Sequence, residues 1–350
     1  MARFPIPTGN DFIFAKLHGL WGRAVHGERL RKLTTCVTEE LFFQSLNNLG
    51  LQISQQDHFQ KKIAAREIAR LQDVIAWADA PTARFIHAKI RNIADENLKL
   101  LLNYRFLPEH EIPISELLVP IPGVEPYDYK TLLEAPNTEK FIEMLPDCQE
   151  FPELPEIIRR LEQDGDFTAS DCAIDSISFQ QEMASARGLS FGLRNVAVEL
   201  VGREIDITNL CMLLRNANMY HIENERLQKF WIPGGEILPL DKLCLLGELQ
   251  TPGEVIDALP PFLGAMLQPF RDQELYRSEH ALWNWLAQRA FQLFRDFTHP
   301  GYSILAYPYL LHFETINLGR IYEGIRFGMP PAVIQEMMVG LRPVSGQSVL

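Results

Sequence analysis

The stretch Glu314-Thr-Ile-Asn317-Leu318 lies inside a long apolar run and is the third occurrence of one pattern in the chain. The pattern is an acidic residue shortly before an Asn-Leu pair, and it occurs earlier as Asp206-Ile-Thr-Asn209-Leu210 and Asp95-Glu96-Asn97-Leu98. The asparagines are 112 (209 − 97) and 108 (317 − 209) residues apart. This regular spacing indicates a structural unit that occurs three times, which decides how the rest of the chain is interpreted.

A second pattern precedes each Asn-Leu pair, at residues 38–46, 137–145 and 251–259. Each copy begins with Thr or Asn, continues with Glu two or three positions later, and ends as a short apolar run that closes on Leu. A Thr or Asn side chain accepts hydrogen bonds from the free backbone N–H groups of a helix start, and Glu in the first turn supports it. We therefore predict short helices that begin after Thr38, Asn137 and Thr251.

Between the two patterns, apolar residues recur at helical spacing, which is typical of a long amphipathic helix with a buried stripe. The stripe is clearest in the first and third copies: Ala64, Ile68, Leu71, Ile75 and Ala78, then Trp283, Leu286, Ala290, Leu293 and Phe297. Strand-like alternation is nearly absent. The sequence therefore predicts an all-α protein of three similar helical-bundle modules, at residues 1–120, 121–235 and 236–350.

Proline-rich links are expected to separate the modules, at about residues 106–136 and 228–252. Proline ends helices and stiffens connectors, so the modules should keep fixed mutual angles. The first two modules share a phrase here, Ile112-Pro-Ile-Ser-Glu-Leu-Leu118 and Ile232-Pro-Gly-Gly-Glu-Ile-Leu238. We interpret Gly234-Gly235 as a turn rather than an anion cradle, because no preceding strand or phosphate-binding Lys accompanies the pair.

The repeated asparagines, Asn97, Asn209 and Asn317, are the residues that most need an explanation. Asn costs a helix about 0.6–0.7 kcal/mol relative to Ala, so three matched placements require a cause. The amide both donates and accepts hydrogen bonds, so we predict that each Asn ties its helix to exposed backbone of another helix rather than contacting a partner protein. Asp206 and Glu314 lie three residues before their asparagines, on the same helix face, and are predicted to join this network.

The composition excludes several classes of function. The formal charge is −12 with a pI near 5.3, and no run of Lys and Arg is present, which argues against nucleic-acid binding. The five cysteines contain no CxxC pair, so neither zinc nor a disulfide framework is predicted, and a reducing compartment is expected. No signal peptide and no apolar run of about 18 residues is found, so any work at a membrane is expected to be peripheral.

Reaction chemistry is also missing from the sequence. The chain has no GxxxxGK[ST] loop, no GxGxxG and no HExxH, and we assign no catalytic, cofactor or metal residue. The cluster Glu109-His110-Glu111 is interpreted as a solvated loop, because adjacent residues do not converge easily on one ion. Among the tryptophans, Trp77 and Trp283 are predicted to be core residues, whereas Trp285 points elsewhere and is a candidate for contact with another module or subunit.

The chain resembles the C-type stalk component of the bacterial and archaeal V-type or A-type ATPases, whose eukaryotic counterpart is the d-type component. The stretch Tyr307-Pro-Tyr-Leu-Leu-His-Phe-Glu-Thr-Ile-Asn-Leu-Gly-Arg-Ile-Tyr-Glu-Gly-Ile-Arg is similar to the family's last helix, and residues 199–215 are similar to its second copy. The chain departs from the family where Thr208 and Ile316 replace an Arg before Asn, and where Ala94 replaces the acidic residue.

The resemblance implies a funnel of three bundles in a pseudo-threefold arrangement, on the cytoplasmic face of the membrane. It also implies a non-catalytic central-stalk rotor subunit of a V-type rotary ATPase, one copy per complex, that couples the central shaft to the membrane rotor ring for proton or sodium transport. The implied partners are the ring and the D- and F-type shaft subunits. Two alternatives stay open: a helical scaffold outside rotary ATPases, and an enzyme with an active site between modules.

Overall fold

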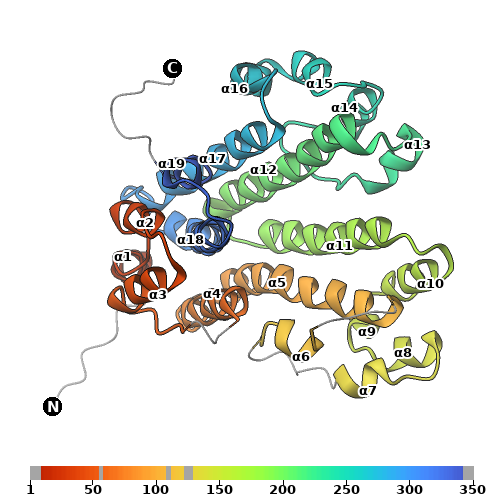
Figure 1. Cartoon of the computed structure of the whole chain (residues 1–350), viewed down its shortest axis with the longest axis horizontal. Coiled ribbons are helices and arrows are strands. Elements are labelled where there is room, and N and C mark those ends of the chain that lie inside the picture. Colours follow the sequence, from red (N-terminus) through yellow and green to blue (C-terminus); the bar gives the residue numbers. More distant parts are fainter. Residues whose placement is uncertain (1–8, 55–57, 108–111, 122–128, 342–350) are drawn as a thin grey trace. The chain divides into compact units, whose positions relative to one another are not determined.

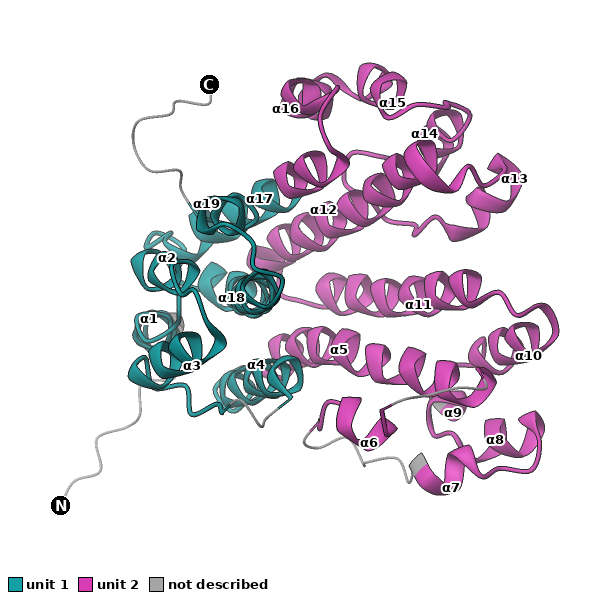
Figure 2. Cartoon of the chain, viewed as in Figure 1, with its two compact units in different colours: residues 1–78, 283–350 teal, residues 79–282 magenta. Residues whose placement is uncertain are grey.

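The computed structural model describes residues 9–54, 58–107, 112–121 and 129–341, and these residues form helices joined by turns and bends, with no strand (Figure 1). The all-α prediction is therefore confirmed. The cluster at residues 109–111 lies outside the described residues. The described part divides into two compact units, residues 1–78 with 283–350 and residues 79–282 (Figure 2).

The first unit is organised around the long helix α18. Its helices are α1 (Asn10–Trp21), α2 (Glu28–Thr34), α3 (Glu39–Asn48), α4 (Phe59–Ile75), the second half of α17 (Leu275–Phe294), α18 (Tyr302–Arg326) and α19 (Pro331–Glu336). Helix α18 contacts α1, α2, α3, α4 and α19. Because it is surrounded, α18 is apolar on nearly every side, and Leu318 and Ile321 meet Phe42, Leu46 and Phe59 in the core.

The second unit is built on three long helices, α5 (Ala80–Phe106), α11 (Phe167–Arg187) and α12 (Phe191–Arg215), of which α11 packs against both others. The remaining helices are short: α6 (Ile114–Leu117), α7 (Tyr129–Leu133), α8 (Thr138–Met144), α9 (Asp147–Glu150), α10 (Leu154–Asp164), α13 (Asn224–Leu227), α14 (Leu240–Leu246), α15 (Pro252–Ala258) and α16 (Pro261–Leu267). A core that includes Leu101, Phe141 and Ile158 holds α8 and α10 against the long helices.

The predicted helix starts are confirmed at all three positions. The side chain of Thr38 accepts a hydrogen bond from the Leu41 N–H, and that of Asn137 accepts one from the Lys140 N–H. Thr251 forms a reciprocal capping box with Glu254, in which each side chain accepts from the other residue's backbone. Each cap satisfies an N–H group that helix geometry leaves free, and the apolar residues that follow enter the core.

The predicted stripes are correct in their centres and wrong at their ends. Ile68 and Leu71 are buried on α4, and Leu286, Ala290 and Leu293 are buried on α17. Ala78 follows the end of α4, and Phe297 follows the end of α17 with 78% of its surface exposed. Trp77 and Trp283 are half-buried, as is Trp285, so the first two are less enclosed than core residues would be.

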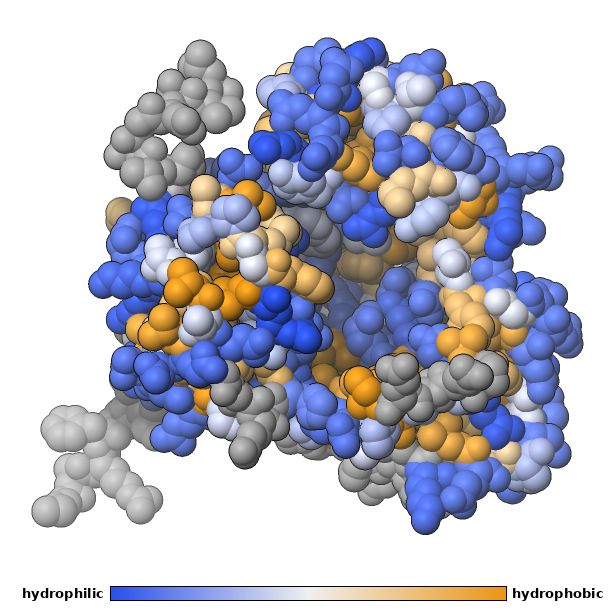
Figure 3. Space-filling view, in the orientation of Figure 1, coloured by the Kyte–Doolittle hydropathy of each residue, from blue (hydrophilic) through white to orange (hydrophobic). Residues whose placement is uncertain are grey.

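The module boundaries 1–120, 121–235 and 236–350 stay a prediction, because the two compact units are defined by contacts and not by repetition. Charged and polar side chains cover most of the face drawn in Figure 3, with apolar side chains in scattered patches, as expected from a chain with 22% charged residues. Within the described ranges, every helix is too short or too polar to cross a lipid bilayer.

Candidate functional site

Three buried amide groups recur in the same local setting on the three long helices α5, α12 and α18. Asn97, Asn209 and Asn317 are 5%, 0% and 3% exposed. Each Asn donates from Nδ2 to the backbone carbonyl of one distant residue and accepts at Oδ1 from the backbone N–H of that same distant residue. The clamped residues are Val119 (2.7 and 2.9 Å), Ile232 (2.8 and 2.9 Å) and Val339 (2.8 and 2.8 Å).

These clamps hold non-helical chain, and not another helix as the sequence analysis predicts. Val119, Ile232 and Val339 all lie outside the helices, in the segment that returns past the helix carrying the Asn. The clamped residue lies 22, 23 and 22 positions after Asn97, Asn209 and Asn317, respectively. A backbone residue in such a segment has no ladder or helix partner, so the amide supplies both of the hydrogen bonds that it would otherwise lack.

The clamps correct the alignment of the two proline phrases. The sequence comparison pairs Ile112 with Ile232, but the hydrogen bonds place Val119 opposite Asn97 as Ile232 lies opposite Asn209. Matching the two phrases by their clamped residues shifts the pairing by seven residues (119 − 112), so that Val119-Pro120 stands opposite Ile232-Pro233. Ile112-Pro113 and Ile232-Pro233 look alike because prolines and apolar residues are frequent throughout both links.

Asp206 extends the second clamp. Its Oδ2 accepts from the Ile237 N–H at 2.7 Å and its Oδ1 from the Leu238 N–H at 3.0 Å. Burial raises the pKa of this carboxyl to about 6, although the backbone N–H groups favour the charged form. Gly235 is required beside it, because a Cβ atom there would overlap the Asp206 carboxylate. Gly234 and Gly235 lie between bends at Pro233 and at Glu236 and Ile237, and Gly234 has a φ of 106° that other residues rarely adopt.

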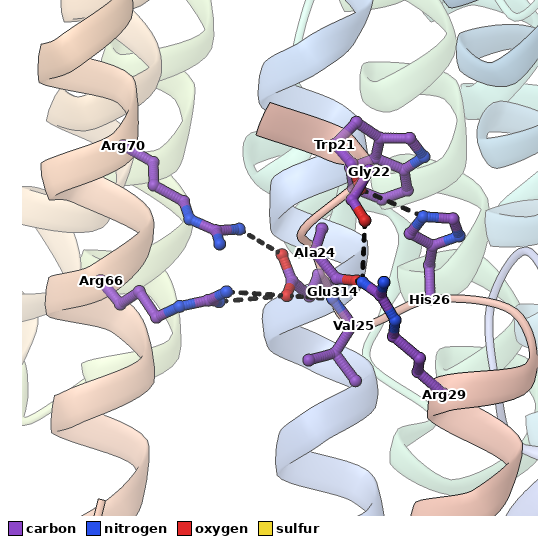
Figure 4. Close-up of polar contacts among 9 residues, drawn as sticks. All are labelled: Trp21, Gly22, Ala24, Val25, His26, Arg29, Arg66, Arg70 and Glu314. Atoms are coloured by element: carbon purple, nitrogen blue, oxygen red, sulfur yellow. Dashed lines mark hydrogen bonds and ion pairs between the residues drawn. The ribbon is translucent and has the colours of Figure 1, made fainter. Parts of the chain in front are cut away.

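Glu314, in the matching position of α18, has different partners (Figure 4). Its Oε1 accepts from the Val25 N–H at 2.7 Å and from Arg66 at 3.1 Å, and its Oε2 accepts from Arg70 at 2.9 Å. Its side chain is only 1% exposed. Glu314 therefore fastens α18 to α4 and to the turn between α1 and α2, and not to the segment that Asn317 clamps.

The same turn is held from its other side by α2. Arg29 donates to the carbonyls of Gly22 and Ala24 at 2.8 and 3.0 Å, and the His26 ring stacks on Trp21 with ring centres 4.6 Å apart (Figure 4). Burial lowers the pKa of His26 below its ordinary value, so the ring is neutral near neutral pH. The turn at residues 22–26 is thus fixed by backbone-directed hydrogen bonds.

The first copy of the pattern has no equivalent carboxylate, since Ala94 occupies the position. The neighbouring Asp95 is buried but faces α11, where it accepts a hydrogen bond from Ser178, and it pairs with Arg91 of its own helix at 3.0 Å. Burial raises the pKa of Asp95, and the Arg91 charge opposes this shift. The Asn97 clamp therefore acts without an acidic neighbour on its own side of the helix.

Sequence reasoning missed a set of buried ionic contacts between α5, α11 and α12. Lys89 contacts Glu182 at 2.6 Å and also pairs with Glu204, and Lys99 contacts Asp175 at 2.5 Å. Burial lowers the pKa of Lys89, but the two carboxylates outweigh it and the net shift is upward. The only signal in the sequence is a charged residue inside an otherwise apolar stripe, which does not reveal its partner. Removing one member would leave an uncompensated charge.

Burial makes two of the cysteine thiols poor nucleophiles. Burial raises the pKa of Cys172 and of Cys211 to about 12, so both thiols stay protonated near neutral pH and are poor nucleophiles. The described residues contain no group of His, Cys, Asp and Glu side chains placed to hold a metal ion. The polar network around the asparagines is thus made of contacts within the protein, which suits a structural role.

Comparison with models of protein families identifies the family of this chain. The family model of the ATP synthase (C/AC39) subunit matches residues 13–337, which is nearly the whole chain and includes Asn97, Asn209 and Asn317. A search of curated proteins gave no match. The chain therefore belongs to the ATP synthase (C/AC39) subunit family, whose members are structural and non-catalytic parts of the rotary ATPase.

Proposed function

We propose that this chain is a rotor part of the central stalk of a V-type rotary ATPase and couples the central shaft to the membrane rotor ring. Its partners would then be the D- and F-type shaft subunits and the ring, with the chain on the cytoplasmic face and one copy in each complex. The ion carried would be a proton or a sodium ion. The observation that carries the proposal is the family match over residues 13–337.

We also propose that Asn97, Asn209 and Asn317 mark three copies of one module. The support is local: each has a long helix, a clamped residue 22 or 23 positions later, and two hydrogen bonds to that residue. A part that transmits torque must resist deformation. Three kinds of contact each fix one element against another: the Asn clamps, the buried ion pairs of Lys89 and Lys99, and the contacts of Glu314 with Val25, Arg66 and Arg70. Their close-packed surroundings compress little.

Co-purification tests the proposed function. The tagged chain, expressed in cells that make the whole ATPase, is expected to recover the shaft and ring subunits in fixed stoichiometry after mild detergent extraction. A tagged variant that lacks the family-matched residues after 300 serves as the control, because it lacks α18 and with it the centre of the first unit. Recovery of neither shaft nor ring by the intact chain would contradict the proposal.

A further inference from the structure

Residues 187–195, called the α11–α12 turn below, comprise the end of α11, the connecting residues 188–190 and the start of α12, and they present an exposed aromatic ring on a rigid support. Phe191 is 82% exposed, more than any other large apolar side chain among the described residues. The turn is anchored from inside, because Leu189 is 1% exposed and its carbonyl accepts a hydrogen bond from Arg194 Nε at 3.2 Å. The helices on either side pack against each other, so the ring is held out at a fixed place.

The turn is also locally cationic in an acidic protein. Arg187 and Arg194 are exposed, and neither forms an ion pair with any carboxylate that the structure describes. The sequence contains no Asp or Glu from residue 183 to residue 198, whereas the whole chain has a formal charge of −12. Glu199, the next carboxylate, is already paired with Arg203 at 2.8 Å. The turn therefore attracts negative charge while most of the surface repels it.

The two next most exposed aromatic residues among those described lack this combination. Phe297 is 78% exposed but follows Asp296, which accepts hydrogen bonds from Thr298 and contacts His299. Phe327 is equally exposed but follows Arg326, whose charge is paired with Glu323. Among these described rings, the turn at 187–195 alone joins an exposed ring to two cations without acidic partners. Aromatic and Arg side chains are the types that dominate binding energy at protein interfaces.

We propose that residues 187–195 bind an acidic patch on another protein of the same rotary ATPase, with Phe191 in an apolar pocket and Arg187 and Arg194 facing carboxylates. This inference rests on the proposed membership in a rotor complex. A lipid surface fits less well: one ring and two cations give a small footprint for membrane anchoring, which usually needs two strong signals, and the acidic remainder of the chain is repelled by anionic lipid.

The test uses the rotary ATPase prepared without this chain and immobilised through one of its other proteins, with the bound fraction of added chain measured against chain concentration and NaCl. Phe191→Ser is expected to weaken binding by about 10- to 100-fold, since a fully buried Phe changes affinity by this order. The double variant Arg187→Gln/Arg194→Gln is expected to weaken binding and to flatten its salt dependence, because exposed charge pairs are screened by salt.

Matched controls separate the turn from general effects. Phe297→Ser removes an equally exposed ring, and Arg159→Gln/Arg160→Gln removes two surface charges from α10 of the same unit; both are expected to leave binding unchanged. Phe191→Ser and Phe297→Ser should melt like the wild type, because both rings are exposed. Arg194→Gln also removes the hydrogen bond to the Leu189 carbonyl, so the single variant Arg187→Gln, which keeps this bond, is measured beside the double variant and should show the same direction of change in binding and salt dependence. If wild-type chain binds and the turn variants bind equally well, this inference alone is overturned.

Two further results are also decisive. If wild-type chain does not bind the complex, the proposed function and this inference fall together. Vesicles of neutral phospholipid, with and without anionic phospholipid, test the lipid alternative. Binding to the anionic vesicles that the turn variants lose, with unchanged binding to the complex, would assign the turn to the membrane and overturn the protein partner.

Discussion

Replacing Asn209 by Leu tests the clamp where water has least access. Asn209 is fully buried and Ile232 is 1% exposed, so the substitution removes two hydrogen bonds and leaves a backbone N–H and a C=O without partners. Each unsatisfied buried group costs about 1–3 kcal/mol. Leu is a better helix former than Asn by roughly half a kcal/mol, which offsets part of this cost. We expect a net loss of about 2–5 kcal/mol in unfolding free energy.

The assay is chemical denaturation followed by circular dichroism, with Asn195→Leu as the control. Asn195 lies on the same helix α12, is exposed and is not clamped to backbone, so its substitution should change stability by less than about 0.5 kcal/mol. Asn97→Leu should cost less than Asn209→Leu, because its partner Val119 is only half-buried and water can replace the amide. Equal stability of Asn209→Leu and wild type would refute the clamp as a stabilising contact.

Three further substitutions test the neighbouring contacts. Glu314→Gln should lower the unfolding free energy by about 2–4 kcal/mol, because Arg66 and Arg70 lose their counter-charge. The control Glu323→Gln, at the surface of the same helix, should have little effect. Equal losses of stability in the two variants would contradict this. Gly235→Ala should lower the unfolding free energy by at least about 2 kcal/mol, and its effect should be less than additive with that of Asp206→Ala. The control Gly192→Ala, whose added Cβ meets no atom within 4 Å, should be neutral or stabilising. Additive losses in the double variant would refute the contact. The raised pKa of Asp206, about 6 against an ordinary 3.8, means that ionising it costs the folded state more than the unfolded chain. This cost is absent below about pH 4 and complete above about pH 6, so wild type should gain stability relative to Asp206→Asn as the pH falls from 7 to 4, and a constant difference in melting temperature would count against the shift.

The sequence was sufficient for features that depend on local chemistry. The caps at Thr38, Asn137 and Thr251 follow from the free N–H groups of any helix start, and the centres of the α4 and α17 stripes follow from helical periodicity. Stripe ends were misplaced because the periodicity of residues such as Phe297 continues past the point where the backbone leaves the helix. Periodicity describes the side chains, and the helix end depends on the backbone beyond them.

The sequence was insufficient for partners that are distant along the chain. It singled out Asn97, Asn209 and Asn317, because Asn inside a helix needs a cause, but it did not reveal that each amide holds a single residue 22 or 23 positions later. It also did not distinguish the roles of Asp206 and Glu314, which occupy matching positions and bind different segments. The partners of Lys89 could not be found either, since its two carboxylates lie on other helices.

The most direct test of the coupling role is ATP-driven ion transport by the rotary ATPase in sealed vesicles, measured with and without this chain. Because the chain is non-catalytic and would only join shaft to ring, complexes that lack it should still hydrolyse ATP but move no ions, and adding the purified chain back should restore transport. Undiminished transport in its absence would contradict the account.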